Sequence, residues 1–184
     1  ALHTEGDRLK FINCRILGNQ DTIYTGAKFT RLYFKDCYID GTTDFIFGPS
    51  TALFEDCIIH SKRNSYVTAA STPKEAKYGY VFKHCKLTAE PGVDKVYLGR
   101  PWRPYAYTLF IECELGKHIV SAGWHNWGKQ SNEETARYME YKNTGEGANA
   151  SERVAWSKQL TKKEAEAVTV DAIFCTQSNW NPID

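Results

Sequence analysis

The sequence predicts an all-β protein: a right-handed parallel β-helix (a solenoid) with a short C-terminal helix and tail packing on it. A Phe-x-x-Cys pattern recurs five times, and Ile or Leu follows two residues after each Cys: Cys14, Cys37, Cys57, Cys85 and Cys113. The steps between these cysteines are 23, 20, 28 and 28 residues. Units of this length are too short to bury a core alone, so we expect them to stack on one another.

Each unit is expected to contain short strands that are joined by corners. In a strand, Cys and the aliphatic residue two positions later share one face, whereas Phe has the opposite parity. Both can point inward only if the chain turns a corner between them. Hairpin signals are few, with Asp40-Gly41 as the main exception. The Leu-x-x-Leu-x-Leu spacing of leucine-rich repeats is absent, and parallel crossovers are nearly always right-handed.

The repeat also predicts the state of the cysteines. Five of the six occupy one register, where they would form a buried stack of small hydrophobic side chains. Disulfide geometry is demanding, so we expect free thiols. No Cys-x-x-Cys pair exists and the five histidines show no metal spacing. We therefore predict neither a metal site nor a cofactor.

Length and charge are typical of one domain that spans residues 1–184. With 184 residues and 42% hydrophobic side chains, the chain can bury a sizeable core. A net charge of +1 gives no reason to expect nucleic acid or an anionic membrane as a partner. No apolar run is long enough for a transmembrane helix. The chain starts without an initiator Met or a signal peptide, so we expect a piece or a processed product.

The C-terminal segment, residues 157–184, has a different pattern. Thr161 and Glu164 have the spacing of a capping box, and Leu160 is placed for a hydrophobic staple on Ala165. These residues predict a helix start. The tail that follows, with Phe174 and Trp180, should pack on the solenoid and cap its end coil, whose backbone would otherwise be unpaired.

Two acidic residues are candidates for chemistry. Asp21 follows Cys14 by seven residues and Asp44 follows Cys37 by seven, so stacking places the two carboxylates side by side. Like charges at that distance push one pKa upward, which can separate an ionised nucleophile from a protonated acid. Arg100 could hold one carboxylate ionised. The structural alternative is an Asp ladder that is satisfied by backbone N–H groups or bound cations.

Aromatic residues lie close to these acids in the sequence. Tyr24, Phe45, Trp102 and Tyr105 flank the acidic and basic residues, and together they would form a groove for stacking on sugar rings. Core packing is the alternative for any one of them. Trp102 is the best candidate for exposure, because Gly99, Pro101 and Pro104 predict an irregular loop there.

Three ordered segments resemble a known family. They are Gln20-Asp-Thr-Ile-Tyr24, Gly41-Thr-Thr-Asp44-Phe-Ile-Phe-Gly48 and Leu98-Gly-Arg-Pro-Trp102. Together with the Gly123-Trp124 segment and the Trp180-Asn-Pro182 tail, they look like pectin methylesterases over essentially the whole chain.

The resemblance implies a role for each matching residue. Asp44 would attack the methyl-ester carbonyl of a galacturonate, and Asp21 would act first as general acid and then as general base. Gln20 would donate to the oxyanion. Arg100 would orient Asp44 and keep it ionised, and Trp102 would stack on the sugar. The implied partner is methyl-esterified galacturonan, and the implied location is extracellular or periplasmic, because the polymer cannot enter the cytoplasm.

The chain also departs from the family pattern. Thr43 replaces the usual Val, and Thr68-Ala-Ala70 replaces a Thr-Ala-Gln, so substrate contacts at Thr68 are expected to differ. The longer spacing from Asp21 to Asp44 suggests a bacterial-type loop. The family's second oxyanion Gln would lie before Ala1, so the chain resembles the C-terminal part of the catalytic domain.

Three rival functions stay open at this stage. The first is a non-catalytic β-helical carbohydrate-binding or envelope relative. The second is an esterase of the same family that acts on a different ester, such as a thioester. The third is a galacturonan lyase or hydrolase, which paired acids would suit but the motif order would not. The sequence does not predict an oligomeric state.

Overall fold

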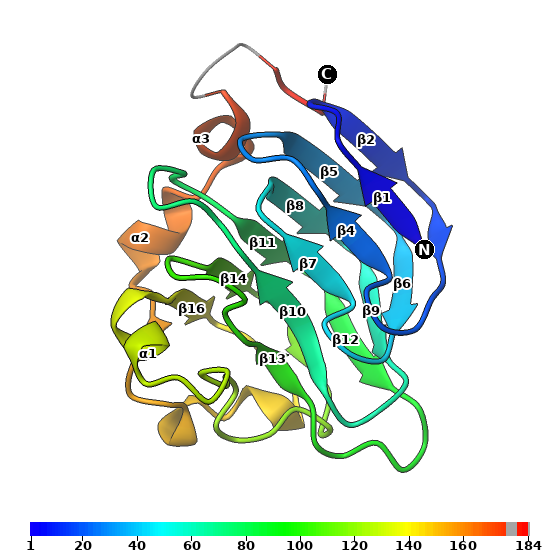
Figure 1. Ribbon diagram of the computed structural model, residues 1–184. Helices are drawn as coiled ribbons and strands as arrows, with labels where there is room; N and C mark the ends of the chain where they lie inside the picture. Colours follow the sequence, from blue (N-terminus) through cyan, green and yellow to red (C-terminus); the bar gives the residue numbers. More distant parts are fainter. Residues whose placement is uncertain (176–179, 184) are drawn as a thin grey trace.

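The chain winds as a right-handed parallel β-helix. The computed structural model describes residues 1–175 and 180–183, and in this part three parallel sheets run the length of the coil (Figure 1). The first five coils contribute one strand to each sheet and β16 and β17 extend sheet B alone, so strands distant in the sequence are neighbours in space. The predicted fold class is confirmed.

The strands divide among three sheets, named A, B and C. Sheet A contains, in order, β1 (Leu2–Thr4), β4 (Ile23–Thr25), β7 (Ile46–Gly48), β10 (Tyr66–Ala70) and β13 (Tyr97–Gly99). Sheet B contains β17 (Lys158–Gln159), β16 (Arg137–Tyr141), β14 (Tyr107–Ile111), β11 (Tyr80–Lys83), β8 (Thr51–Glu55), β5 (Arg31–Lys35) and β2 (Leu9–Ile12). Sheet C contains β15 (Glu114–Leu115), β12 (Lys86–Ala89), β9 (Ile58–Ser61), β6 (Tyr38–Gly41) and β3 (Arg15–Ile16).

The predicted corner between Phe and Cys has a clear backbone cause. The residue before each repeat Cys has a φ between 51° and 53°: Asn13, Asp36, Asp56, His84 and Glu112. This left-handed conformation turns the chain from sheet B into sheet C, and Asn, Asp and His tolerate it better than most residues. As a result, Phe and Cys both face the interior despite their opposite parity.

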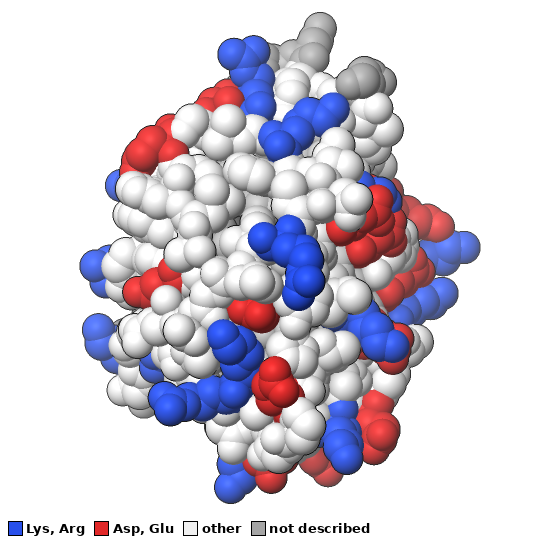
Figure 2. Space-filling model, turned by 90° about the vertical axis from the view of Figure 1, so that its right-hand side faces the viewer, with Lys and Arg blue, Asp and Glu red and all other residues white. Residues whose placement is uncertain are grey.

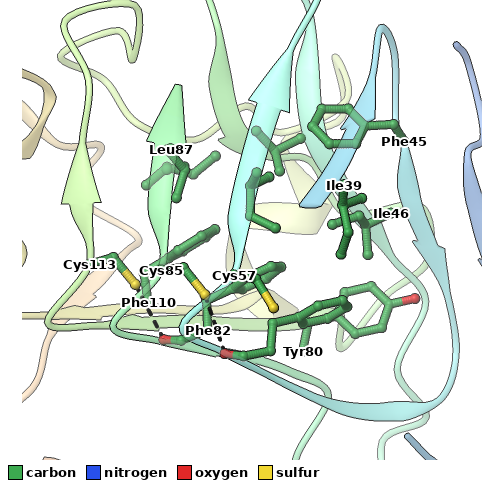
Figure 3. Close-up of a cluster of buried hydrophobic side chains, with 14 of the residues drawn as sticks. Ile39, Phe45, Ile46, Cys57, Tyr80, Phe82, Cys85, Leu87, Phe110 and Cys113 are labelled. Carbon is green, nitrogen blue, oxygen red and sulfur yellow. Dashed lines mark hydrogen bonds between the residues drawn. The ribbon is translucent and has the colours of Figure 1, made fainter. Parts of the chain in front are cut away.

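The core is a set of columns of identical residues (Figure 3). The rings of Phe34, Phe54, Phe82 and Phe110 stack with centroid spacings of 4.4 to 4.6 Å. Beside them, the thiols of Cys85 and Cys113 each donate to a Phe carbonyl of the preceding coil, at 3.4 and 3.5 Å. The five repeat cysteines are free thiols, as predicted. The stack of small side chains therefore fills the corner without cross-linking the coils.

A further coil continues the repeat with polar residues. In β16, Glu140 pairs with Phe110 of β14, so it occupies the Phe position. Lys142 has a φ of 46°, and Asn143 follows it in the Cys position. The Asn143 side chain accepts from the Cys113 N–H at 3.0 Å and donates to Glu140 at 3.1 Å. The pattern search missed this coil because its two diagnostic residues are polar.

The helices lie outside the coil. They are α1 (Ser131–Thr135), the 3₁₀ turns Glu146–Ala148 and Ala150–Glu152, α2 (Lys162–Glu166) and α3 (Val170–Phe174). Thr161 and Glu164 form the predicted capping box of α2. No helix in the described parts of the chain is long and apolar enough to cross a membrane.

The C-terminal segment contacts both the end and a side of the solenoid: β17 pairs with β16 at the end of sheet B, and the helices that follow cover the outer face of that sheet. Its buried residues Ala165, Val168, Ile173 and Phe174 pack with the outward-facing side chains of sheet B in a second apolar cluster. In Figure 1, α2 and α3 lie along the left side of the coil. Sheet B thus carries hydrophobic side chains on both of its faces, and the C-terminal helices cover the outer face.

Candidate active site

The two acidic residues lie at the same edge of sheet A. Asp21 and Asp44 lie two residues before β4 and β7, in the same register, and both have left-handed backbone, with φ of 58° and 49°. The Asp21 N–H donates to the Thr43 carbonyl at 3.1 Å, and the Asp44 N–H donates to the Tyr66 carbonyl at 2.9 Å. Because adjacent strands are about 4.8 Å apart, the predicted side-by-side placement holds.

Asp44 is paired with Arg100 in a forked geometry. Nε and Nη2 of Arg100 donate to the two carboxylate oxygens of Asp44 at 2.9 and 2.7 Å. The Asp44 side chain is 8% exposed and that of Arg100 is 19% exposed. Arg100 follows β13, and its N–H donates to the Thr68 carbonyl at 3.0 Å. A bidentate guanidinium of this kind stabilises the ionised carboxylate.

Asp21 has a different environment. Burial, and then the negative charge of Asp44, raise the pKa of the Asp21 carboxyl. No hydrogen bond to its carboxylate oxygens is seen within the described residues. The two carboxyl groups at this edge therefore differ in their surroundings: Asp44 is held by the Arg100 fork, whereas Asp21 has no such partner and its pKa is raised.

The guanidinium of Arg100 is also covered by two aromatic rings. Its Cζ lies 3.9 Å from the ring centroid of Tyr66 and 3.7 Å from that of Trp127. The sequence prediction missed both residues. The spacing could have revealed Tyr66, which lies 22 residues after Asp44 in the same register. Trp127 lies in a loop, and the repeat spacing of the strands does not predict the position of a loop residue.

Aromatic rings continue across the outer face of sheet A. Tyr24 of β4 stacks on Phe47 of β7 at 4.5 Å, and the Trp102 ring meets Phe47 edge-on at 5.7 Å. Tyr24 and Trp102 also line a pocket of about 370 Å³ at the far end of these strands. The row therefore offers flat apolar surface on the strands that follow the two acids, and a sugar contact at Tyr24 and Trp102 stays a prediction.

Other predicted contacts lie elsewhere. Phe45 is 0% exposed and belongs to the core, so its ring does not reach the groove. Thr68 is also 0% exposed, and its hydroxyl donates to the Leu98 carbonyl at 2.9 Å. Tyr105 is half-buried, and Lys74 Nζ lies 5.3 Å from its ring centroid. Gln20 is exposed, in the turn directly before Asp21.

Phe45 was misassigned for a backbone reason. Phe45 lies before β7, so the alternation within that strand, with Ile46 inward and Phe47 outward, does not extend to it, and Phe45 and Ile46 are both buried. No group of three or more His, Cys, Asp or Glu side chains that could hold a metal ion occurs within residues 1–175 and 180–183. The chemistry of the site is thus that of two carboxyl groups, one guanidinium and aromatic surface.

Comparison with known proteins decides the family. A sequence model described as Pectinesterase matches residues 1–177. The chain belongs to the pectinesterase family. It is 44% identical to Pectinesterase 31 of Arabidopsis thaliana over 166 residues, which cover 90% of this chain and 52% of that protein.

Solved pectin methylesterases have the same fold. The carrot enzyme superposes with a TM-score of 0.86 at 34% identity, over 92% of this chain and 57% of the carrot chain. A pectin methylesterase solved in complex with a hexasaccharide gives a TM-score of 0.81 at 30% identity, over 96% and 59% of the two chains. The chain thus spans about half the length of the curated relative. The expectation of a bacterial-type loop stays a prediction.

Proposed function

We propose that this pectinesterase-family chain carries the catalytic acids of an esterase that removes methyl groups from galacturonate units of pectin. The observation that supports this most is the contrast between the two carboxyl groups. Asp44 is held by the fork of Arg100, whereas burial and the charge of Asp44 raise the pKa of neighbouring Asp21. A nucleophile and an acid at neighbouring positions are what acyl transfer requires.

In the first half-reaction, a carboxylate oxygen of Asp44 attacks the carbonyl carbon of the methyl ester. The negative charge passes to the carbonyl oxygen, and exposed Gln20 is the candidate donor to it. The C–O bond to the methoxy group then breaks, and the Asp21 carboxyl gives its proton to the departing methanol. The product is an anhydride between Asp44 and the galacturonate.

In the second half-reaction, Asp21 is ionised and accepts a proton from water. The water oxygen attacks the carbonyl carbon of the galacturonate, and the bond to the Asp44 oxygen breaks. Asp44 leaves as a carboxylate, which the Arg100 fork receives again, and the sugar keeps a free acid. Asp21 has regained its proton, so the cycle closes without a metal or a redox group.

Sugar binding is assigned to the aromatic row. The rings of Tyr24 and Trp102 line the 370 Å³ pocket at the far end of the strands that follow the acids, and flat aromatic faces suit the apolar faces of sugar rings. The hexasaccharide complex of a solved relative supports an oligosaccharide as the partner. Figure 2 shows basic and acidic side chains interspersed on one face of the molecule. On that face, local contacts with the sugar would therefore contribute more to pectin binding than a broad surface of one charge. We place the protein outside the cytoplasm, extracellular or periplasmic.

The direct test is methanol release from highly methylated pectin. We would compare the chain with Asp44→Asn, and would also assay the complete gene product if its reading frame extends upstream of Ala1. Release that disappears in Asp44→Asn, without new reducing ends, supports the proposal. New reducing ends would indicate a lyase or hydrolase. Folded protein that releases no methanol in either form would favour the binding relative or a different ester such as a thioester.

A further inference from the structure

The loop that carries Trp127 is attached to the strand that carries Arg100. This loop, residues 123–128, follows β15 and precedes α1. The Leu98 N–H of β13 donates to the Gly123 carbonyl at 2.8 Å, and the His125 N–H donates to the Gly99 carbonyl at 3.1 Å. Trp127 itself has a left-handed backbone, with a φ of 63°. The loop is therefore held against β13 at the residue directly before Arg100.

The two rings lie on opposite faces of the Arg100 guanidinium. Tyr66 and Trp127 are both within 4 Å of Cζ, and one face of a planar guanidinium has no room for two rings at that distance. The edge of the group is engaged by the two hydrogen bonds to Asp44. Both faces and the Nε edge are thus shielded, and the fork has little freedom to tilt away from the carboxylate.

His125 holds the Trp127 backbone in place. Its Nδ1 accepts a hydrogen bond from the Trp127 N–H at 3.0 Å, which requires that Nδ1 carries no proton. Burial, and then the positive charge of Arg100, lower the pKa of His125 and favour this neutral form. The groups that face its ring are Tyr66 of β10 at 5.4 Å, Tyr97 of β13 at 5.3 Å, and Arg100.

The rest of the loop is rigid for its own reasons. Asn126 accepts from the Gly128 N–H at 2.8 Å and donates to Glu133 at 2.7 Å. The Asn126 carbonyl accepts from Asn132, a buried residue of α1, at 3.0 Å. These bonds fix the loop in the protein alone, so the contact of Trp127 with Arg100 does not depend on a bound sugar.

We propose that Trp127 and Tyr66 are positioning residues that clamp Arg100 onto Asp44, and that His125 keeps this clamp closed by accepting the Trp127 N–H. The inference rests on the proposed function, in which Asp44 must be ionised to attack. Its chemistry is simple: the rings exclude water from the guanidinium, and each ring stabilises the cation through its negative face. A shielded, fixed cation keeps the adjacent carboxylate ionised to lower pH.

The first test is the pH profile of kcat/KM for methanol release by Trp127→Leu and Trp127→Phe. Loss of the ring in Trp127→Leu should shift the acid limb upward by roughly 0.5 to 1.5 pH units, with a larger fall in kcat than rise in KM. Trp127→Phe keeps an aromatic face and should stay closer to the parent profile. An unmoved acid limb in a folded Trp127→Leu protein would overturn the proposal.

A matched control exists at the first residue of β5, in sheet B. The Trp180 ring lies over the guanidinium of Arg31, at 5.6 Å, and Arg31 pairs with Asp7 at 2.6 Å. Trp180→Leu thus removes a tryptophan from another Arg–Asp pair, away from sheet A. Its acid limb should match that of the parent. A shift of equal size in Trp180→Leu would mean that general destabilisation, not the clamp, moves the profile.

Two substitutions of His125 test whether its role is to accept the Trp127 N–H. In His125→Asn the side-chain oxygen can still accept the N–H two residues on, as Asn does in Asx turns, whereas His125→Leu cannot. The Asn variant should therefore retain the acid limb of the parent, and the Leu variant should shift it in the same direction as Trp127→Leu. Equal profiles for the two variants would remove His125 from the proposal.

A measurement independent of activity keeps the two proposals distinguishable. The Asp44 carboxyl can be titrated by carbon NMR in the parent and in Trp127→Leu. A higher pKa in the variant supports the clamp even if the chain releases no methanol, in which case only the proposed function fails. Equal Asp44 pKa values in two folded proteins would refute the clamp regardless of the activity.

Discussion

Arg153 donates from Nε to Oε1 of Glu140 at 2.7 Å and from Nη2 to Oε2 at 3.2 Å, where each side chain is only 3% exposed. Glu140 stands in the Phe position of the polar coil, directly above Phe110. It also accepts from the Trp124 indole N–H at 3.3 Å. This ion pair thus connects the end of the apolar core to the start of the loop that reaches Arg100.

Breaking this pair should be costly. Arg153→Met leaves a buried, uncompensated carboxylate, which we expect to lower the free energy of unfolding by about 3–5 kcal/mol. The double variant Glu140→Met with Arg153→Met should recover part of that loss, because no charge stays buried. Urea denaturation of the single and double variants measures both effects. A single variant within about 0.5 kcal/mol of the parent would contradict the expectation.

Removing the charge of Asp21, unlike breaking the Arg153–Glu140 pair, should stabilise the fold. In Asp21→Asn the carboxylate that Asp44 repels is gone, so a small rise in Tm at pH 7 should accompany the loss of methanol release. Because the pKa of folded Asp21 is raised, the folded state binds its proton more tightly than the unfolded state. Stability of the parent therefore falls as pH rises from 3.8, the ordinary pKa of an Asp carboxyl in the unfolded chain, through the raised pKa of folded Asp21.

The readout is the difference in Tm between Asp21→Asn and the parent across this pH range. The difference should be absent below the unfolded-state pKa, grow through the window and then stay constant. Asp40→Asn is a suitable comparison, since Asp40 lies in β6 and its carboxylate faces the Lys62 ammonium at 3.8 Å, an attraction that the neutral amide loses. That substitution should lower Tm, not raise it. A lower Tm for Asp21→Asn at pH 7 would disprove the repulsion.

The sequence allowed the fold to be predicted because its repeat is carried by large, identical core residues. Phe three positions before Cys, with a left-handed polar residue between them, specifies the corner of each coil. The pairing of Asp21 with Asp44 followed from the same period. At Glu140 and Asn143, polar residues occupy the Phe and Cys positions of the repeat, so the Phe-x-x-Cys pattern did not detect this coil.

The site was predictable only where it follows the register. Phe45 lies between Asp44 and the start of β7, so the sequence could not show that Phe47 faces out and Phe45 faces in. Trp127 reaches Arg100 from a loop that lies 27 positions later, and local pattern does not reveal such contacts. Long-range packing of irregular segments was the missing information.

Gly99 is required by a close approach at the site. A Cβ at this position would lie 2.1 Å from Oγ1 of Thr68. We expect Gly99→Ala to destabilise the fold by about 1–3 kcal/mol, because the neighbouring strand must move. The double variant with Thr68→Ala should recover part of this loss, although it also gives up the bond to the Leu98 carbonyl.

A double-mutant cycle on urea unfolding measures the coupling between Gly99 and Thr68, which should exceed about 1 kcal/mol. Gly6→Ala is the matched control, since its nearest neighbour, a Leu9 methyl, lies at an ordinary 3.4 Å. Strictly additive effects of Gly99→Ala and Thr68→Ala would contradict the expectation that the new methyl group collides with the Thr68 side chain.

His118 makes the stability of the fold sensitive to acid. It is 3% exposed, and its Nε2 has no hydrogen-bond partner within the described residues. Burial, and then the nearby His60, lower the pKa of His118 to about 4. Between this value and the unfolded value of 6.5, the unfolded state binds a proton that the folded state does not. Stability should therefore fall as pH drops through this window, by roughly 1 kcal/mol per pH unit.

His118→Leu removes both the titration and the unpaired nitrogen. Urea midpoints measured between pH 4 and 7.5 should decline with acidity in the parent and do so less steeply in His118→Leu, with the largest difference at the acid end. His84→Leu is the control, because the His84 side chain is 48% exposed and faces Asp56 and Glu112. Parallel declines for the parent and His118→Leu would show that acid sensitivity originates elsewhere in the fold.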